Sequence, residues 1–452
     1  EGHLNANIEV DTVDGVQQIV HVQMTGTLFR GFEKLLEGRD PRDAPIITSR
    51  ICGVCPTSHS EVAVLALDQA GGVAAPAAGR ILRNLVHGAC FLESHILHFY
   101  LLSLPDYIQG PALPPWTPKF EMDRRVDQAS QDLFLAHYLE AINVRRECHE
   151  MGALFGGKLP HSPAYIAGGF TAVPSAGNLA AFETHLDNIL NFIETRYIPD
   201  AERLATLYSD YFLIGRGYGN LLCYGAFELN DSGTAKLFPA GRVVAGGAVQ
   251  AMDQAAITED VTRSWYTNDS GTLHPSVEET VPQYPKAGAY SWLKAPRYDG
   301  LPYECGPLAR MWCRGDYTNG VSTMDRIRAR AYEARLLAAA MKNWLAELSA
   351  GETTYTPWIN PGAATAVGLT EAPRGALGHW IGIVDGRIEH YQVITPTCWT
   401  ISPRDGAGQL GPLEQALMGT PIADAKHPVE ALRVIHSVDP CLDCATHVMQ
   451  RK

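Results

Sequence analysis

The chain has 452 residues, a net charge of −13 and 46% hydrophobic residues, a composition that can bury a large core and excludes a disordered protein. The negative charge excludes a general nucleic-acid-binding protein, because such a protein needs a positive surface. No uninterrupted apolar run approaches the roughly 18–20 residues of a membrane span, and no signal-peptide pattern is visible at the N-terminus. The length fits about two to four ordinary domains or one large unit.

The first half of the chain predicts a β-hairpin followed by a helical body. In residues 1–60, apolar and polar residues alternate on both sides of the turn signal Asp14-Gly15, and loop-forming residues follow. Helical periodicity then dominates residues 61–215. The helices expected there cover residues 62–70, 78–104, 125–153 and 176–213.

The second half begins with a different composition. Residues 216–320 are rich in Gly, Pro, Tyr, Trp and Asp, which predicts short strands and loops that cover the helical body. Residues 321–350 return to a strong helix, and residues 351–452 are mixed. The elements expected there are strands at 380–384 and 387–394 and a helix at 413–418. Because no linker or repeat is visible, the chain is predicted to be a single domain, mainly α with small β-sheets at both ends.

Four of the ten cysteines form two CxxC pairs, Cys52/Cys55 and Cys441/Cys444. This spacing lets two thiolates reach one metal, and four thiolates make a soft site suited to zinc, nickel or iron–sulfur. Spacing alone leaves three interpretations open, namely a structural zinc site, a catalytic metal centre and two unrelated pairs. The pairs lie near opposite ends of the chain, which favours a catalytic centre, because the whole fold has to close to assemble the site.

The sequences around the two pairs resemble those of a known family. They read RICGVCPTSH at residues 50–59 and DPCLDCATH at residues 439–447, and together they resemble the large subunit of [NiFe]-hydrogenases. Further matches are EGH at 1–3, FRGFE at 29–33 and EAPRG at 371–375. The resemblance implies a large helical core in which N- and C-terminal segments meet at a buried Ni–Fe centre near an iron–sulfur small subunit. The implied reaction is the reversible heterolytic cleavage of H₂ to protons and electrons, which pass to that subunit.

The resemblance also implies roles at the metal centre. Cys52, Cys55, Cys441 and Cys444 would bind nickel, and Cys55 and Cys444 would bridge to an iron that also carries CO and cyanide. Thiolates are soft donors that lose their protons on binding a metal, which agrees with these assignments. Cys441, terminal on nickel, is the implied proton acceptor, and Glu1 is the implied carboxylate that relays the proton. Taken alone, Glu1 is typical of a solvated terminal acid.

Five further residues are implied to surround the metals. The guanidinium of Arg374 is expected over them, with Pro373 lining the pocket of the diatomic ligands and Asp439 orienting Arg374. Thr397 is expected to hydrogen-bond a cyanide, and His59 to hydrogen-bond a cysteine sulfur. Outside this resemblance, Arg374 is typical of a surface cation, Asp439 of a turn before proline and Thr397 of an ordinary strand.

Glu33 and His447 match the ligands of a separate family site for Mg²⁺ or Fe²⁺ near the C-terminus. A carboxylate with water suits Mg²⁺, whereas an added imidazole also admits Fe²⁺. The six single cysteines provide no further iron–sulfur ligand set, so the electron-transfer clusters are expected in a partner chain.

Three features depart from the family pattern or qualify it. Ser94 stands where many members have an aspartate, so Arg374 is expected to depend more on Asp439. Cys441 is written as cysteine, so no selenium is predicted. Residues Val448–Lys452 follow the second motif, where family members are usually trimmed, and this tail is expected to be ordered against the body if it is present in the mature protein.

Several functions remain to be separated. The leading one is a hydrogenase catalytic subunit, and the alternative with the same centre is an H₂-sensing regulatory subunit with low turnover. A core subunit of the related quinone oxidoreductases is disfavoured, because those relatives have lost the four cysteines that are retained here. A structural protein held by zinc is the last alternative. A periplasmic or membrane-associated location through the small subunit is favoured over the cytoplasm.

Overall fold

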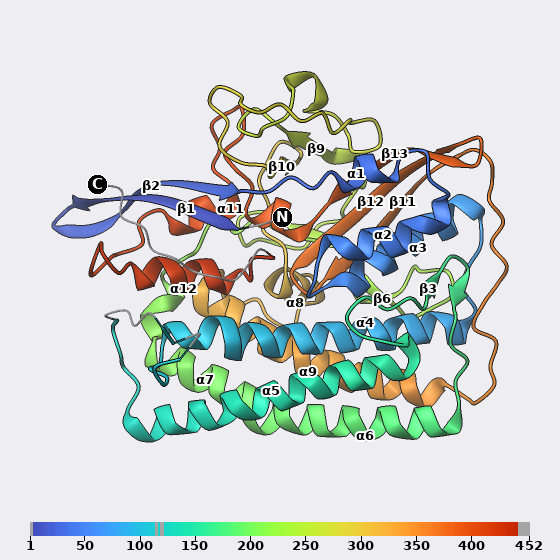
Figure 1. The fold of residues 1–452 in the computed structure, drawn as a ribbon. Coiled ribbons are helices and arrows are strands. Elements are labelled where there is room, and N and C mark those ends of the chain that lie inside the picture. The colour runs from blue at the N-terminus through green and yellow to red at the C-terminus, as the bar shows by residue number, and fades with distance from the viewer. Residues whose placement is uncertain (1–2, 114–115, 118–121, 442–452) are drawn as a thin grey trace.

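The computed structural model describes residues 3–113, 116–117 and 122–441. Its body is a group of long helices that run roughly side by side in the lower half of Figure 1. They are α4 (Ala77–Leu97), α5 (Gln128–Gly156), α6 (Ala176–Phe192), α7 (Ile198–Leu207) and α9 (Thr323–Glu347). α4 packs between α5 and α9, and α6 closes the layer by packing on both.

Local sequence explains where the body helices begin and end. The side chains of Asp127, Ser175 and Ser322 each accept a hydrogen bond from a backbone N–H in the first turn of α5, α6 and α9, respectively. Gly157 ends α5 with a φ of 74°, a conformation that glycine adopts at no steric cost. The helix expected over 176–213 is interrupted, because a π-helical turn at Ile193–Tyr197 separates α6 from α7.

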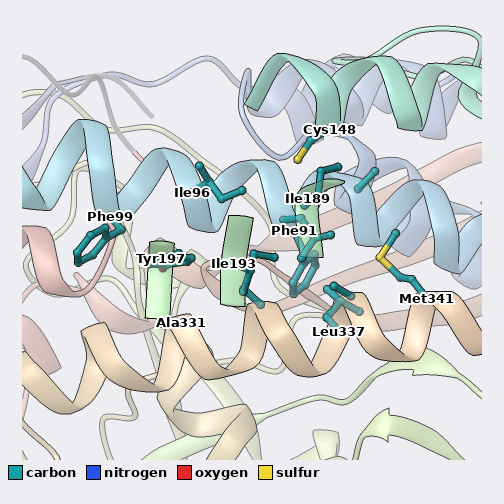
Figure 2. Packing of buried hydrophobic residues seen from close by; sticks show 14 of the residues in the cluster. Phe91, Ile96, Phe99, Cys148, Ile189, Ile193, Tyr197, Ala331, Leu337 and Met341 are labelled. Atoms are coloured by element: carbon teal, nitrogen blue, oxygen red, sulfur yellow. The ribbon is translucent and has the colours of Figure 1, made fainter. Parts of the chain in front are cut away.

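The apolar side chains of α4 pack into the core of the body. Figure 2 shows Phe91 and Ile96 of α4 meeting side chains of α6 and α9 such as Ile189 and Leu337. Burial of each such side chain contributes about 1.5–3 kcal/mol. The segment Ala77–Asp106 is long and apolar enough to cross a membrane by length and composition, but 89% of its most apolar window is buried inside the protein, as in a core helix.

The remaining helices are short or lie outside the body. Figure 1 shows α1, α2 and α3 beside the main sheet, and α12 at the opposite side of the molecule next to α11. Their bounds are α1 (Phe32–Leu36), α2 (Ala44–Thr48), α3 (Pro56–Gly71), α8 (Pro307–Arg314), α10 (Pro396–Thr400), α11 (Pro412–Leu417) and α12 (Val429–Ser437). Short 3₁₀ or π turns are η1 (Pro41–Asp43), η2 (Ser49–Ile51), η3 (His98–Ser103), η4 (Leu104–Asp106), η5 (Ile193–Tyr197), η6 (Ser209–Phe212), η7 (Gln254–Ala256) and η8 (Asn268–Ser270).

The main sheet carries one wall of the site. It is antiparallel in the order β11 (Ala364–Ala372), β12 (Gly375–Val384) and β13 (Arg387–Ile394). A two-residue turn, Pro373-Arg374, joins the first two strands, so both residues stand at the tip of a hairpin. Helix α3 packs directly on β11 at Gly368, where a Cβ atom would lie 2.1 Å from the carbonyl oxygen of Val62. Only glycine allows this close approach of helix and strand.

The N-terminal hairpin is confirmed. β1 (Leu4–Val13) and β2 (Val16–Gly26) pair around the turn at Asp14-Gly15, and they project from the body at the left of Figure 1. Residues 216–320 form short paired strands and loops, as expected, and they also contain the helix α8, which was not predicted. These strands are β5 (Leu221–Cys223), β6 (Ala226–Glu228), β7 (Lys236–Phe238), β8 (Gly241–Val243), β9 (Ile257–Asp260) and β10 (Ala295–Tyr298), and β3 (Tyr165–Ile166) and β4 (Gly169–Phe170) precede them.

Candidate metal centre

Three cysteine sulfurs converge where the two ends of the chain meet. The Sγ atom of Cys441 lies 3.1 Å from that of Cys52 and 3.9 Å from that of Cys55. Within the described ranges, these cysteines are the one group of three or more potential ligands whose donor atoms all lie within 4.8 Å of one another. Cys444, the fourth cysteine of the predicted set, lies outside the described residues.

Local structure positions each sulfur. Cys55 is the residue before α3, and its backbone N–H lies 3.1 Å from the Sγ of Cys52. The N–H of Val54 lies 3.4 Å from the same sulfur, so two backbone dipoles favour a thiolate there. Cys441 follows α12, and its backbone N–H donates to the Thr397 hydroxyl oxygen at 3.2 Å. Thr397 thereby ties the second cysteine motif to α10.

The three thiols oppose one another electrostatically. Hydrogen bonding to Cys441 and Cys55 holds the pKa of Cys52 well below its usual range. The pKa values of Cys441 and Cys55 are raised well above the usual range, because each hydrogen-bonds the other two thiols and is buried beside them. Like charges this close resist simultaneous ionisation, and a divalent cation removes that repulsion. The site therefore fits a thiolate-bound metal.

A buried arginine lies over the sulfurs, paired with an aspartate. The Nη2 atom of Arg374 is 3.0 Å from Oδ1 of Asp439, and both side chains are almost fully buried. Burial opposes the charge on Arg374, but Asp439 and the three thiols raise its pKa well above the usual value. Its Nε and Nη1 atoms have no hydrogen-bond partner within the described part of the chain. These two donors are available to an anionic group bound at the metals.

A second arginine, which the sequence analysis did not single out, holds the other side of Asp439. The Nη1 atom of Arg330 on α9 donates to Oδ2 of Asp439 at 3.0 Å. Burial alone would raise the pKa of Asp439, but Arg374 and Arg330 lower it below the usual value. Ser94 stands at the position where an aspartate is common in the family. It is fully buried, and its hydroxyl has no partner among the described residues. Asp439 is thus the carboxylate that joins two guanidinium groups.

The ionic network continues away from the metals into α8 and α9. Glu333 accepts from Arg310 Nη2 at 2.7 Å and lies 2.8 Å from the Nε2 atom of His95. Arg310 also donates to the carbonyl oxygens of Ala372 and Pro373, at 2.9 and 2.8 Å. Pro373 is therefore held by its backbone, and Arg310 fixes the hairpin tip that carries the arginine over the sulfurs. The sequence signal for Arg330 and Glu333 was that the helix predicted at 321–350 carries charged residues on several faces, including faces that have to be buried.

Two histidines and a tyrosine form a buried chain beside the first cysteine motif. Nδ1 of His59 lies 3.2 Å from Nε2 of His379, and Nδ1 of His379 lies 2.8 Å from the Tyr391 hydroxyl. Burial lowers the pKa of His59 to about 4 and that of His379 well below its usual value, so both rings are neutral at pH 7. His59 was predicted to lie near a cysteine sulfur, whereas its two partners were not predicted.

Glu33 lies at a second polar cluster. Its helix α1 packs on β13, and Lys294 and Glu259 are the charged groups that act on its carboxyl. Burial raises the pKa of Glu33, opposed by Lys294 and supported by Glu259. Lys294 Nζ donates to Glu278 Oε1 at 2.5 Å and lies 3.6 Å from Glu259 Oε2. Burial and the nearby Glu259 raise the pKa of Glu278 to about 10, so this carboxyl is neutral at pH 7. Glu33 and Glu259 offer the carboxylate oxygens that a divalent cation prefers.

Three further predicted residues fall outside the described part of the chain, as does the predicted tail. They are Glu1, Cys444 and His447, together with residues 448–452. Cys52 and Cys55 lie just before α3 and meet Cys441, which follows α12. Thr397 of α10 and Arg374 of the β11–β12 turn are brought to them by the contacts with Cys441 and Asp439.

The sequence matches a family model described as nickel-dependent hydrogenase over residues 30–113, 111–320 and 313–447. The chain belongs to the nickel-dependent hydrogenase family. It is 41% identical to the periplasmic [NiFeSe] hydrogenase large subunit of Desulfomicrobium baculatum, over 99% of this chain and 93% of that protein. It is 33% identical to the Hydrogenase-1 large chain of Escherichia coli K12, over the same shares of the two chains, 99% and 93%.

Solved structures agree with these sequence matches. The reduced Ni-Fe-Se hydrogenase from Desulfovibrio vulgaris Hildenborough has a TM-score of 0.94 and 41% identity, covering 98% of this chain and 96% of that chain. The reduced, active form of the enzyme from Desulfomicrobium baculatum has a TM-score of 0.93 at 40% identity, again covering 98% and 96%. The predicted family and the mainly α-helical fold with small sheets are confirmed.

Proposed function

We propose that this chain is the catalytic large subunit of a hydrogenase, which interconverts H₂ with protons and electrons. The observation that carries this proposal is the convergence of Cys52, Cys55 and Cys441 beneath a buried arginine in a chain of the nickel-dependent hydrogenase family. The relatives are named as hydrogenases, including an uptake enzyme and Hydrogenase-1, which does not favour the sensor alternative.

The residues present fit a Ni–Fe group with CO and cyanide ligands. Soft thiolates suit nickel and iron, and Cys444 is proposed as the fourth ligand. The Nε and Nη1 atoms of Arg374 are buried donors without a partner in the described chain, so they suit the negative end of a cyanide. The Thr397 hydroxyl accepts from the backbone of Cys441 and keeps its own proton for a second such ligand. When bound, the Ni–Fe group supplies the Lewis acidity and the two-electron redox chemistry for H₂ cleavage.

The chain itself handles the proton. We propose that Cys441 accepts it at Sγ, since this thiol is more exposed than the buried Cys52 and Cys55. Arg374 holds a fixed positive charge over the reacting atoms and needs no rearrangement, because Asp439 already orients it. Glu1 is proposed to relay the proton onward. Since Cys441 is a cysteine in this sequence, the proposed terminal ligand is sulfur and not selenium.

A second divalent cation is proposed at Glu33 and His447. The support is the second carboxylate, Glu259, which acts electrostatically on Glu33 at a partly buried place. Carboxylates and water suit Mg²⁺, and the imidazole would also admit Fe²⁺.

An iron–sulfur small subunit is the proposed electron acceptor and partner, as expected for the large subunit of a heterodimeric hydrogenase. The six single cysteines of the sequence form no further CxxC pair, so we propose that the electrons pass to clusters held by this partner. The periplasmic relative supports a periplasmic or membrane-associated location through that partner.

The test is co-expression with the small subunit, followed by metal analysis, infrared spectroscopy and an H₂-uptake assay with an artificial acceptor. Nickel equimolar with the chain, CO and cyanide bands and rapid H₂ uptake are expected. The same bands with very slow turnover would favour the sensor, and zinc without bands would overturn the proposed centre.

A further inference from the structure

Helix α5 carries exposed apolar side chains on its outer face. The helix packs on α4, α6 and η3, and Figure 1 shows it on the side of the helical body away from the main sheet. Leu139 and Ile142 are 64% and 44% exposed, whereas Phe134, Ala141 and Cys148 on the opposite face of the helix are fully buried. Large apolar side chains that gather on one exposed face mark a contact surface, whereas single ones need no explanation.

The spacing along this outer face is that of a pair of long helices. Side chains that follow one another at intervals of four and three residues form one seam, as in helices that cross at a small angle. Apolar residues occupy the middle of the seam on α5, and polar residues occupy both of its ends. The members of the seam are Gln128, Asp132, Leu135, Leu139, Ile142 and Arg146.

The two ends of the seam are complementary to each other in one orientation. Asp132 and Arg146 lie seven residues before and seven residues after Leu139. In an antiparallel pair of α5 helices centred on Leu139, each Asp132 therefore faces the Arg146 of the other copy. Gln128 and Glu150 are in the same way eleven residues from Leu139, so an amide donor faces a carboxylate acceptor. A parallel pair would bring like charges together, so the charges select the antiparallel pair.

The polar side chains of the seam are available for such a contact. Arg146 and Glu150 are 70% and 54% exposed, and the ion pair that they form within the helix is long, at 3.5 Å. Asp132 accepts a hydrogen bond from Gln128 at 2.7 Å, and both residues are exposed. Exposed pairs of this kind contribute about 0–1 kcal/mol, so their exchange for contacts with a second copy costs little.

We propose that the outer face of α5 binds a second copy of this chain, in an antiparallel α5–α5 contact with Leu139 at the two-fold axis. The exposed Ala136 then faces Ile142 of the other copy, and a small residue opposite a large one lets the two helices approach closely. Because each copy uses the same face, the contact closes at the dimer. One pair of helices buries less area than a standard interface, so the dimer is expected to dissociate on dilution.

The experiment measures the mass of the purified complex with the small subunit by analytical ultracentrifugation over a range of concentrations. Leu139→Asp places two carboxylates together at the axis. Asp132→Arg and Arg146→Glu each put like charges opposite one another, and the double variant Asp132→Arg/Arg146→Glu restores opposite charges. Leu213→Asp is the matched control, because Leu213 is 68% exposed but lies outside α5.

We expect the wild type and Leu213→Asp to form a dimer of complexes as the concentration rises. Leu139→Asp and each single charge change should weaken dimerisation roughly tenfold or more, and the double charge exchange should dimerise like the wild type. A wild-type complex that stays single at every concentration, or a dimer that Leu139→Asp does not weaken, would overturn the proposal. Failure of the double variant to recover would overturn the antiparallel arrangement.

The contact does not depend on the metals, so this proposal and the proposed function fail separately. A dimer that forms from protein without nickel, and that shows the same response to the variants, supports the contact on its own. If Leu139→Asp does not fold, the charge exchange decides, because it changes exposed side chains only. A single complex that instead binds phospholipid vesicles, and loses this binding in Leu139→Asp, would assign the face to a membrane and overturn the proposal.

Discussion

The helical body and the surroundings of the metal centre are both buried, but different forces hold them together. In the body, Phe91, Leu337 and Met341 pack through apolar contacts that have no preferred direction. Around the centre, Arg374, Arg330 and Asp439 are held by ion pairs and hydrogen bonds with fixed geometry. Helix α4 contributes to both regions, with Phe91 in the apolar core and His95 in the ionic network.

This difference shows where the molecule tolerates change. A well-packed apolar core accepts another side chain of similar volume at a small cost. A buried ion has no substitute for its partner, because loss of one partner leaves an unpaired charge, at a cost of about 3–5 kcal/mol. The helical body contributes most of the stability, and the ion pairs around the metal centre orient the chemical groups.

The largest expected difference between the two regions is the effect of replacing one buried cysteine in each of them by serine. Cys52→Ser replaces a soft ligand with a hard one and should abolish nickel binding and H₂ uptake. Cys148→Ser changes a cysteine that is fully buried between the body helices, and it should leave nickel content and turnover intact with at most a loss of stability. Nickel analysis and an H₂-uptake assay of the two variants test this difference. Loss of the metal from Cys148→Ser as well would contradict it.

The second expected effect is on stability in the ionic network. Arg330→Met leaves Asp439 with one guanidinium group and should lower the free energy of unfolding by about 3–5 kcal/mol. Arg335→Met changes an exposed arginine on the same helix and should stay within about 0.5 kcal/mol of the wild type. Denaturant titration followed by circular dichroism measures the free energy of unfolding of both variants. An equal loss in the two variants would show that the ion pair of Arg330 with Asp439 adds no particular stability.

The third expectation is a dependence of stability on pH that arises in the network and not in the body. Burial disfavours the charged form of Glu333, but Arg310 and His95 lower its pKa to about 2, below the usual 4.5. As the pH falls from 4.5 towards 2, the unfolded state takes up this proton first, so stability is lost in that window and is fully present above it. The expected loss is of order 3 kcal/mol.

A matched variant isolates that carboxylate. Glu333→Gln removes the titrating group, so its stability should be lower at neutral pH and fall less between pH 4.5 and pH 2 than that of the wild type. Denaturant titrations at several pH values test this. An acid slope unchanged by Glu333→Gln would assign the acid sensitivity to other carboxylates.

Sequence analysis predicted the body and the ligands of the centre better than it predicted the network. The N-terminal hairpin, the long helices and the strand at 387–394 follow from local patterns, and the family resemblance placed the cysteines together. Arg310, Arg330 and Glu333 were missed because their partners are distant in sequence, and a charged residue on a helix is usually exposed. The partners of His59 were missed for the same reason, since His379 and Tyr391 are brought to it by the pairing of β12 and β13.

The smallest effect is expected for a substitution that conserves volume in the apolar core of the helical body. Leu337 is fully buried in the body, and Leu337→Met keeps its volume with a flexible, unbranched side chain, so the expected cost is below about 1.5 kcal/mol. Leu337→Ala in the same place leaves a cavity and should cost about 2–5 kcal/mol. Both variants should keep full nickel content, because no polar contact of the centre passes through this residue. If Leu337→Met lowered H₂ uptake without loss of stability, the packing of α4 against α9 would be coupled to the geometry of Arg330 and Asp439, and the two regions would not be separable.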